Sequence, residues 1–212
     1  MYGLKRIMSH KHNHRTVCYN CYRPKSSCMC AYITPIETKT RFIILMHPKE
    51  FRKTKNGTGH FTHLSLPNSE LYVGIDFRDH HKINEIINDP NNLSYVLYPS
   101  KESIVLNDHV IGEENKKSVV FLIDSTWPCS RAILSASPNI AALPKVSFRH
   151  TKSSAFTFKT QPKEYCLSTM ESTLCLLELL NRHKVEDIKK EVLENFLLPF
   201  HKMVEYQLSC NL

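Results

Sequence analysis

Short apolar runs that alternate with helical patterns constrain the fold of this chain most strongly. Residues 41–47, Arg-Phe-Ile-Ile-Leu-Met-His, form a nearly continuous apolar run, which is typical of a strand covered on both faces. Further strands are predicted at residues 71–77, 95–98, 119–123 and 145–148, and helices at residues 80–87 and 128–136. Strands that alternate with helices predict an α/β fold with a mostly parallel sheet, whose ligands bind at the carboxyl ends of the strands.

The last third of the chain is predicted to be helical. Residues Ser168-Thr169-Met170-Glu171 resemble a capping box, in which the first and fourth residues satisfy backbone N–H groups at a helix start. The apolar residues of this helix fall on one face: Met170, Leu174, Leu177 and Leu180. A second helix is predicted over residues 185–207, kinked or broken by Pro199.

The charge balance favours a polyanionic partner. The 212 residues include 28 Lys and Arg against 20 Asp and Glu, a formal net charge of +8. Contacts between such side chains and phosphates release condensed counterions, although an inert basic surface explains the same excess. No apolar run reaches the roughly 18 residues of a membrane-spanning helix. The amino terminus lacks the apolar stretch of a secretory signal, so we expect a cytoplasmic protein with no membrane partner.

A Cys-rich segment at residues 1–40 is predicted to precede an α/β domain at residues 41–212. Four cysteines lie within thirteen residues: Cys18, Cys21, Cys28 and Cys30. Two close thiolate pairs can close a tetrahedral zinc site, and in a reducing compartment such clustering favours a metal over disulfides. Free surface thiols, or ligands from the histidines at residues 10–14, are the alternatives. A four-cysteine site leaves no open coordination position, so the zinc would be structural.

Polar side chains and the single tryptophan follow one of the predicted strands. Asp124, Ser125, Thr126 and Trp127 come directly after the apolar residues 121–123 and just before a predicted helix. An α/β fold places its functional site at such a position. Helix capping by the acid and the hydroxyl, with the tryptophan filling core, explains the same residues. Residue types alone leave both interpretations open.

This segment matches the Asp-x-Thr-Trp signature of the DTW-domain family, and the chain resembles that family in further blocks in the same order. The other blocks are Cys18, Cys21, Arg23, Pro24, Cys28 and Cys30; His47-Pro48-Lys49-Glu50; Asn56-Gly57-Thr58-Gly59; Tyr98-Pro99-Ser100; Leu143-Pro144; and Ser168-Thr169-x-Glu171. One loop departs from the family pattern, with His60 in place of an expected Arg and Gly57 as an extra residue. This difference affects the contacts of the loop more than the chemistry.

The resemblance implies a tRNA-uridine aminocarboxypropyltransferase with a SPOUT-like α/β fold, in which a deep knot near the carboxyl end binds S-adenosylmethionine. Such an enzyme transfers the 3-amino-3-carboxypropyl group to the ring nitrogen N3 of a uridine in tRNA and releases methylthioadenosine. Asp124 is the candidate general base for the proton of this nitrogen. SPOUT-like enzymes are often dimers, but here the Cys-rich appendage is expected to replace the partner, which favours a monomer.

Loops after successive strands are expected to form the cofactor pocket. The candidate residues are Leu97, Tyr98, Pro99 and Ser100 in one loop, Thr126 and Trp127 in the next, and Leu143 and Pro144 in a third. At the following helix start, Ser168 and Thr169 are candidates to bind the methionine carboxylate, and Glu171 its ammonium group. A capping box explains these three residues without a ligand.

Basic side chains in or beside the motif blocks are candidates for RNA binding, and each is equally explained as solvated surface. They are Arg23, Lys25, His47, Lys49, Arg52, Lys53, Lys55 and Arg131. Trp127 or Tyr98 is a candidate to stack on the target base, which must be exposed or flipped out of a folded tRNA.

Two other functions stay open from the sequence. An S-adenosylmethionine-dependent RNA methyltransferase has the same architecture but produces S-adenosylhomocysteine. A non-catalytic zinc-containing RNA-binding protein, in which Asp124 and Trp127 are structural, binds no S-adenosylmethionine.

Overall fold

A six-stranded sheet, parallel throughout, forms the centre of the computed structural model, which describes residues 16–52, 57–150 and 167–210. The strand order is β2-β1-β5-β3-β6-β4. The strands are β1 (Arg41–Met46), β2 (Ser69–Val73), β3 (Asn92–Leu97), β4 (Ile104–Val105), β5 (Lys117–Asp124) and β6 (Lys145–Ser147). The α-helices are α1 (Pro48–Arg52), α2 (Thr58–Ser65), α3 (His81–Asn88), α4 (Trp127–Ala136), α5 (Pro138–Ala141), α6 (Thr169–Arg182), α7 (Lys190–Asn195) and α8 (Leu198–Ser209). Two short 3-10 helices, η1 (Lys25–Ser27) and η2 (Cys30–Tyr32), precede the sheet.

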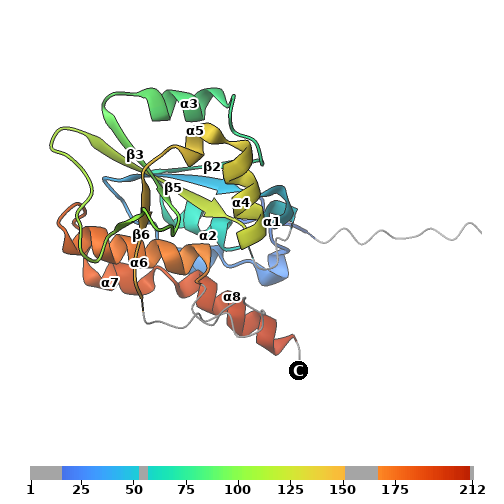
Figure 1. Cartoon of the computed structure of the whole chain (residues 1–212). Coiled ribbons are helices and arrows are strands. Elements are labelled where there is room, and N and C mark those ends of the chain that lie inside the picture. Colours follow the sequence, from blue (N-terminus) through green and yellow to red (C-terminus); the bar gives the residue numbers. More distant parts are fainter. Residues whose placement is uncertain (1–15, 53–56, 151–166, 211–212) are drawn as a thin grey trace, which may run out of the picture.

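Alternate residues of the central strands face two separate cores, one on each side of the sheet. On β1, Phe42 and Ile44 are buried in one core, whereas Ile43 and Leu45 are buried in the other. Helices α2, α6, α7 and α8 contribute to the first core, and α3, α4 and α5 to the second, so helices cover both faces (Figure 1). A strand covered on both faces needs apolar side chains at successive positions, which explains the continuous run in the sequence.

The central strands end at a common edge of the sheet. Met46 at the end of β1 pairs with Asp124 at the end of β5. Leu97 at the end of β3 pairs with Leu122, so β5 extends two residues further than its neighbour. Because these strands are parallel, the loops that follow them lie side by side and form the expected location for a ligand.

The α/β fold and the parallel sheet predicted from the sequence are confirmed. The strands predicted at residues 41–47, 95–98, 119–123 and 145–148 correspond to β1, β3, β5 and β6. The strand predicted at residues 71–77 is wrong in extent, because β2 ends at Val73 and Phe77 is buried beyond the strand. Neither β4, with two residues, nor α1, with five, was predicted, since so short an element shows no periodicity.

The helix predicted over residues 185–207 is also wrong in extent. Residues 185–189 are not helical, α7 and α8 replace the single helix, and Pro199 lies in the first turn of α8. The Asn181 side chain stabilises the non-helical turn, because it accepts a hydrogen bond from Ile188 N (2.7 Å) and donates one to Ile188 O (2.9 Å). The helices predicted at residues 80–87 and 128–136, and the one after the capping box, are confirmed as α3, α4 and α6. In the described part of the chain, no helix is long and apolar enough to cross a membrane.

The Cys-rich segment packs against the same core as the carboxyl-terminal helices. Cys21, Met29 and Ile36 belong to the hydrophobic cluster that α6, α7 and α8 complete. Just before β1, the buried carboxylate of Glu186 accepts hydrogen bonds from the backbone N–H groups of Lys39 (2.9 Å) and Thr40 (2.7 Å). A buried carboxylate therefore joins the end of this segment to the turn after α6.

Removing the charge of Glu186 should destabilise this junction. We expect Glu186→Gln to lower the free energy of unfolding by about 2 kcal/mol, because hydrogen bonds to a charged acceptor are stronger than hydrogen bonds to an amide oxygen. Urea denaturation followed by circular dichroism measures the change. Glu191→Gln is the matched control, since Glu191 is exposed on α7. Equal stabilities of the two variants would contradict the prediction.

Candidate functional site

The carboxylate of Asp124, at the end of β5, is enclosed between two helices. The residue is 5% exposed, and its Oδ1 accepts a hydrogen bond from the hydroxyl of Thr169 on α6 (2.6 Å). Its Oδ2 lies against Gly59 on α2, where an added Cβ would be 2.4 Å from that oxygen. Because a glycine alone permits so close an approach, α2 and α6 together fix the position of the carboxylate.

A capping box at the start of α6 places Thr169 for this contact. Ser168 Oγ accepts from Glu171 N (3.2 Å), and Glu171 Oε2 accepts from Ser168 N (2.7 Å). The capping box predicted from the sequence is therefore confirmed. The side chain of Glu171 is buried, and it accepts its hydrogen bond within the capping box at the start of α6.

Helix α4 does not use Asp124 as its N-cap. The N-cap residue is Thr126, whose side chain makes no capping hydrogen bond, and Pro128 lies in the first turn. The side chain of Asp124 instead bonds across to α6. Of the two interpretations of this acid, capping of the following helix is wrong.

A cavity of about 350 Å³ lies beside the Asp124–Thr169 pair, at the carboxyl edge of the sheet. Its lining comes from the ends of β3, β5 and β6 and from the starts of α4 and α6: Leu97, Tyr98, Pro99, Leu122, Ile123, Ser125, Trp127, Ser130, Ser147, Phe148, His150, Leu167, Thr169 and Ser172. The rings of Tyr98 and Trp127 meet edge to face with centroids 5.9 Å apart. Trp127 remains 38% exposed, so it forms part of the cavity wall and is not core filling.

The structure brings together part of the predicted cofactor set. Leu97, Tyr98, Pro99, Trp127 and Thr169 line the cavity. The other candidates do not line it: Ser100, Thr126, Leu143, Pro144, Ser168 and Glu171.

The third predicted loop lies before β6 instead of after it. The side chain of Leu143 packs in the core with α3 and α4, and the carbonyl of Pro144 accepts from Val96 N (3.0 Å) inside the sheet. The cavity wall is formed instead by Ser147 and by the residues after β6.

Sequence reasoning also missed two serines in the wall. Ser130 follows Trp127 by three residues on α4, and Ser172 follows Thr169 by three residues on α6. Residues three apart share one face of a helix, so this spacing could have indicated both serines.

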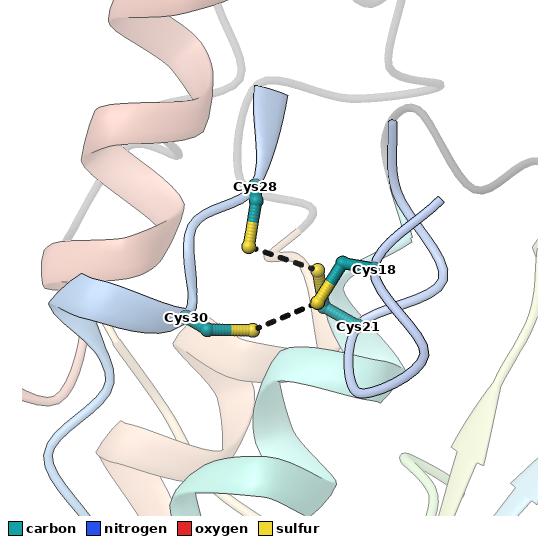
Figure 2. Close-up of side chains that lie close together, drawn as sticks. All are labelled: Cys18, Cys21, Cys28 and Cys30. Atoms are coloured by element: carbon teal, nitrogen blue, oxygen red, sulfur yellow. Dashed lines mark hydrogen bonds between the residues drawn. The ribbon is translucent and has the colours of Figure 1, made fainter. Parts of the chain in front are cut away.

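The four clustered cysteines point toward one another (Figure 2). Their sulfur atoms all lie within 4.8 Å of one another, with Cys18–Cys30 and Cys21–Cys28 separations of 3.8 Å. Tetrahedral zinc with Zn–S bonds of about 2.3 Å requires S–S separations of about 3.8 Å, whereas a disulfide requires about 2.05 Å. The cluster is therefore compatible with a structural metal ion.

Backbone geometry prepares one of these thiols for metal binding. N–H groups of Cys21 and Asn20 lower the pKa of the Cys18 thiol to about 6, which favours the thiolate that a metal requires. Burial raises the pKa of the Cys30 thiol. A bound cation would compensate for that burial.

The basic candidates divide into exposed and buried residues. Lys25, Lys49, Arg52 and Arg131 are exposed. Their sequence neighbours Lys53 and Lys55 lie outside the described residues.

Arg23 and His47 are buried. The guanidinium of Arg23, 1% exposed, donates to Ser27 O (2.9 Å) and lies 5.5 Å from the ring centroid of Phe61. Arg23 therefore supports the packing of the cysteine turn on α2 and is not available to a phosphate. The ring Nδ1 of His47 accepts a hydrogen bond from the backbone N–H of Lys49 at the start of α1 (3.1 Å). The backbone N–H of His47 donates to the backbone carbonyl of Asp124 (3.1 Å).

Comparison with known proteins gives a consistent result. The DTW domain matches residues 15–208. The chain is 31% identical over 206 residues to tRNA-uridine aminocarboxypropyltransferase 2 of Drosophila melanogaster, covering 93% of this chain and 77% of that protein. It is 25% identical to the proteins of the same name from Mus musculus and Macaca fascicularis, covering 92% of this chain and 64% of each relative. No solved structure gives a significant match.

Loss of one cluster ligand should release a metal ion. We expect the purified chain to contain about one zinc ion and Cys21→Ser to contain almost none, because three thiolates hold zinc less tightly than four. The variant should also unfold at a lower temperature, since Cys21 is buried in the core. Elemental analysis by mass spectrometry and thermal unfolding measure both effects. Cys129→Ser, outside the cluster, should retain the metal; similar zinc contents in the two variants would exclude this site.

Proposed function

The chain belongs to the DTW-domain family, and we propose that it transfers the 3-amino-3-carboxypropyl group of S-adenosylmethionine to N3 of a uridine in tRNA, with release of methylthioadenosine. The resemblance inferred from the sequence motifs is confirmed by the family match and by the relatives. The names of these relatives support uridine modification in tRNA as the activity.

The observation that carries the proposal is a buried acid beside a cavity at the carboxyl edge of a parallel sheet. Asp124 is oriented by Thr169, and Thr169 also lines the cavity. A carboxylate fixed in this way is suited to proton transfer, whereas a surface acid would have no defined orientation. The same edge is the ligand-binding position of open α/β sheets in general.

Uracil N3 is a weak acid, so its proton must be removed for the nitrogen to act as a nucleophile. S-adenosylmethionine, when bound, supplies the γ carbon of its methionine arm as the electrophile. We assign the proton acceptor as Asp124, with the Thr169 hydroxyl holding Oδ1 so that the carboxylate keeps one orientation. The surrounding helices exclude water from the acid, which is 5% exposed.

The cavity residues suit a ligand with both apolar and polar parts. We assign the adenine moiety to the loop of Leu97, Tyr98 and Pro99 with Trp127, where aromatic and apolar side chains form the wall. The carboxylate of the methionine arm is assigned to the start of α6 at Thr169, because a helix N-terminus favours an anion. Glu171 is not assigned to the ammonium group, since it bonds to Ser168 N.

The sheet order supports a SPOUT-like, knotted topology. Strand β6 lies between β3 and β4, although both precede it in the chain and are joined by residues 98–103 alone. A later segment inserted between two earlier, closely linked strands is the arrangement that a knot requires. The path that would close it runs through residues 151–166, outside the described part of the chain.

Zinc in the cysteine cluster and RNA on the basic surface complete the proposal. The metal would hold the turn of residues 18–30, which has few apolar residues of its own, and would take no part in the chemistry. Exposed Lys25, Lys49, Arg52 and Arg131 are assigned to RNA phosphates, and each would contribute to the salt dependence of binding.

Nucleoside mass spectrometry tests the reaction. Purified protein, S-adenosylmethionine and unmodified tRNA should produce a uridine heavier by one aminocarboxypropyl group, together with methylthioadenosine. A methylated nucleoside with S-adenosylhomocysteine would instead establish a methyltransferase. If calorimetry detects no binding of S-adenosylmethionine, the chain would instead be a non-catalytic RNA-binding protein.

Removing the base while preserving its hydrogen bond should slow the reaction selectively. Asn at position 124 retains an oxygen for the Thr169 hydroxyl but is a very poor proton acceptor. We expect Asp124→Asn to lower kcat by about 10²- to 10⁴-fold, with unchanged binding of S-adenosylmethionine. Single-turnover assays and calorimetry measure these quantities, and Asp187→Asn, at an exposed acid, is the control.

A second variant separates the position of the acid from its chemistry. Gly59→Ala keeps the carboxylate, but its methyl group would lie 2.4 Å from Asp124 Oδ2 and 2.7 Å from Met46 Cε. Displacement of the acid should lower kcat in a protein whose zinc content is normal. Wild-type turnover in both Asp124→Asn and Gly59→Ala would rule out the assigned base.

A further inference from the structure

Three aromatic rings from separate segments meet beside the candidate site. They belong to Tyr22 in the cysteine turn, Phe51 on α1 and His60 on α2. The ring centroids are 6.1 Å apart for Tyr22–Phe51, 5.3 Å for Tyr22–His60 and 5.6 Å for Phe51–His60. Tyr22 is 47% exposed and Phe51 39%, whereas His60 is 6% exposed. His60 thus forms the floor of an aromatic platform whose exposed rings are Tyr22 and Phe51.

The backbone holds both exposed rings in place. Tyr22 has φ of 57°, a left-handed conformation that is unfavourable for a tyrosine, and its N–H donates to Cys18 O (2.8 Å). Clustered cysteines lie on either side of it in the sequence, so a metal ion bound by them would maintain this turn. Phe51 N donates to His47 O (3.2 Å), and the same His47 donates its N–H to Asp124 O (3.1 Å).

The platform is linked to the segment that carries the acid. Two backbone hydrogen bonds, through His47, connect Phe51 to Asp124. His60 follows Gly59, which contacts the Asp124 carboxylate. Both the cavity, through Thr169, and the platform, through Gly59 and His47, are therefore connected to Asp124.

Burial lowers the pKa of His60, so the imidazole is neutral near neutral pH and makes no ionic contact with a phosphate. This residue stands where the family pattern leads us to expect an arginine, which would carry a permanent charge. The substitution exchanges a charge for a flat ring that supports Tyr22 and Phe51. At this position the chain thus provides packing for an aromatic surface.

Three exposed cations lie close to the platform residues in the sequence. Lys49 and Arg52 flank Phe51 on α1, and Lys25 lies three residues after Tyr22. All three are exposed, and none forms an ion pair with another described residue. Glu50 is the one acid on α1. Exposed rings among unpaired cations are the combination that binds single-stranded nucleic acid, because every base has a face to stack and every nucleotide a phosphate.

We propose that Tyr22 and Phe51 bind an unpaired base of the RNA substrate by stacking, at a nucleotide adjacent to the target uridine. The inference rests on the proposed function for its orientation relative to the target. It adds a second base-binding position, separate from Trp127 and Tyr98, and assigns RNA contact to the cysteine turn through its tyrosine. Lys25, Lys49 and Arg52 would neutralise the phosphates on either side.

Phe51→Leu tests the platform most directly, because leucine keeps apolar volume on a five-residue helix but cannot stack. We expect tRNA binding to weaken about 10-fold, measured by fluorescence anisotropy, and Phe51→Trp to restore it. The slope of log Kd against log salt should not change in Phe51→Leu, whereas Arg52→Gln should reduce it by about one phosphate contact. Wild-type protein should prefer a single-stranded loop over a perfect RNA duplex, and Phe51→Leu should reduce that preference.

Tyr22→Leu and Tyr22→Phe form the second pair, with the leucine variant expected to weaken binding and the phenylalanine variant to retain it. Tyr19→Leu is the matched control, since Tyr19 is 91% exposed in the same turn and belongs to no ring contact among the described residues. Zinc content and S-adenosylmethionine affinity should be unchanged in Phe51→Leu. Unchanged tRNA affinity in Phe51→Leu and Tyr22→Leu, or an equal loss in Tyr19→Leu, would overturn the platform.

The two proposals fail in different measurements. If wild-type protein forms the modified uridine while the KM for tRNA is the same in Phe51→Leu, the platform is wrong and the function stands. If wild-type protein forms no modified nucleoside but its RNA affinity depends on Phe51 and Tyr22, the platform stands and the proposed reaction is wrong.

Discussion

The hydrogen bond between Thr169 and Asp124 connects the two parts of the chain that make the site. It joins the end of a central strand to the first turn of the longest described helix, across 45 positions in the sequence. The capping box fixes the helix start, and the largely buried strand β5 fixes the acid. On the opposite side of the carboxylate, Gly59 brings α2 into contact. The position of the acid beside the cavity and at the start of α6 therefore depends on one short contact in a region that excludes water.

Strong local patterns were sufficient to predict the frame of the molecule. Continuous apolar runs identified β1 and β5, and the capping box identified the start of α6, because each pattern reflects backbone geometry within a few residues. Residues that are buried by segments distant in the sequence showed no such local pattern. The side chain of Arg23 is buried against Phe61 of α2, and Leu143 is buried against residues of α3, α4 and α5. Neither partner could be identified without the tertiary arrangement.

The cysteine segment is more than a stapled appendage on the α/β domain. Its buried cysteine and methionine complete the core beneath α8, and Arg23 reaches across to α2. The segment thereby contacts α2, which is the helix that carries Gly59. A metal ion held by the four thiolates would thus act on the geometry of the site indirectly, by keeping this packed segment in register with α2.

The contact between Gly59 and Asp124 has a consequence for how such chains can diverge. The carboxylate occupies the space into which any side chain at position 59 would have to grow. A mutation at either position alone is therefore penalised: a larger residue at 59 meets the acid, and a shorter residue at 124 leaves a void against bare backbone. The two positions are expected to change jointly during evolution or to remain as they are, although 65 positions separate them along the chain.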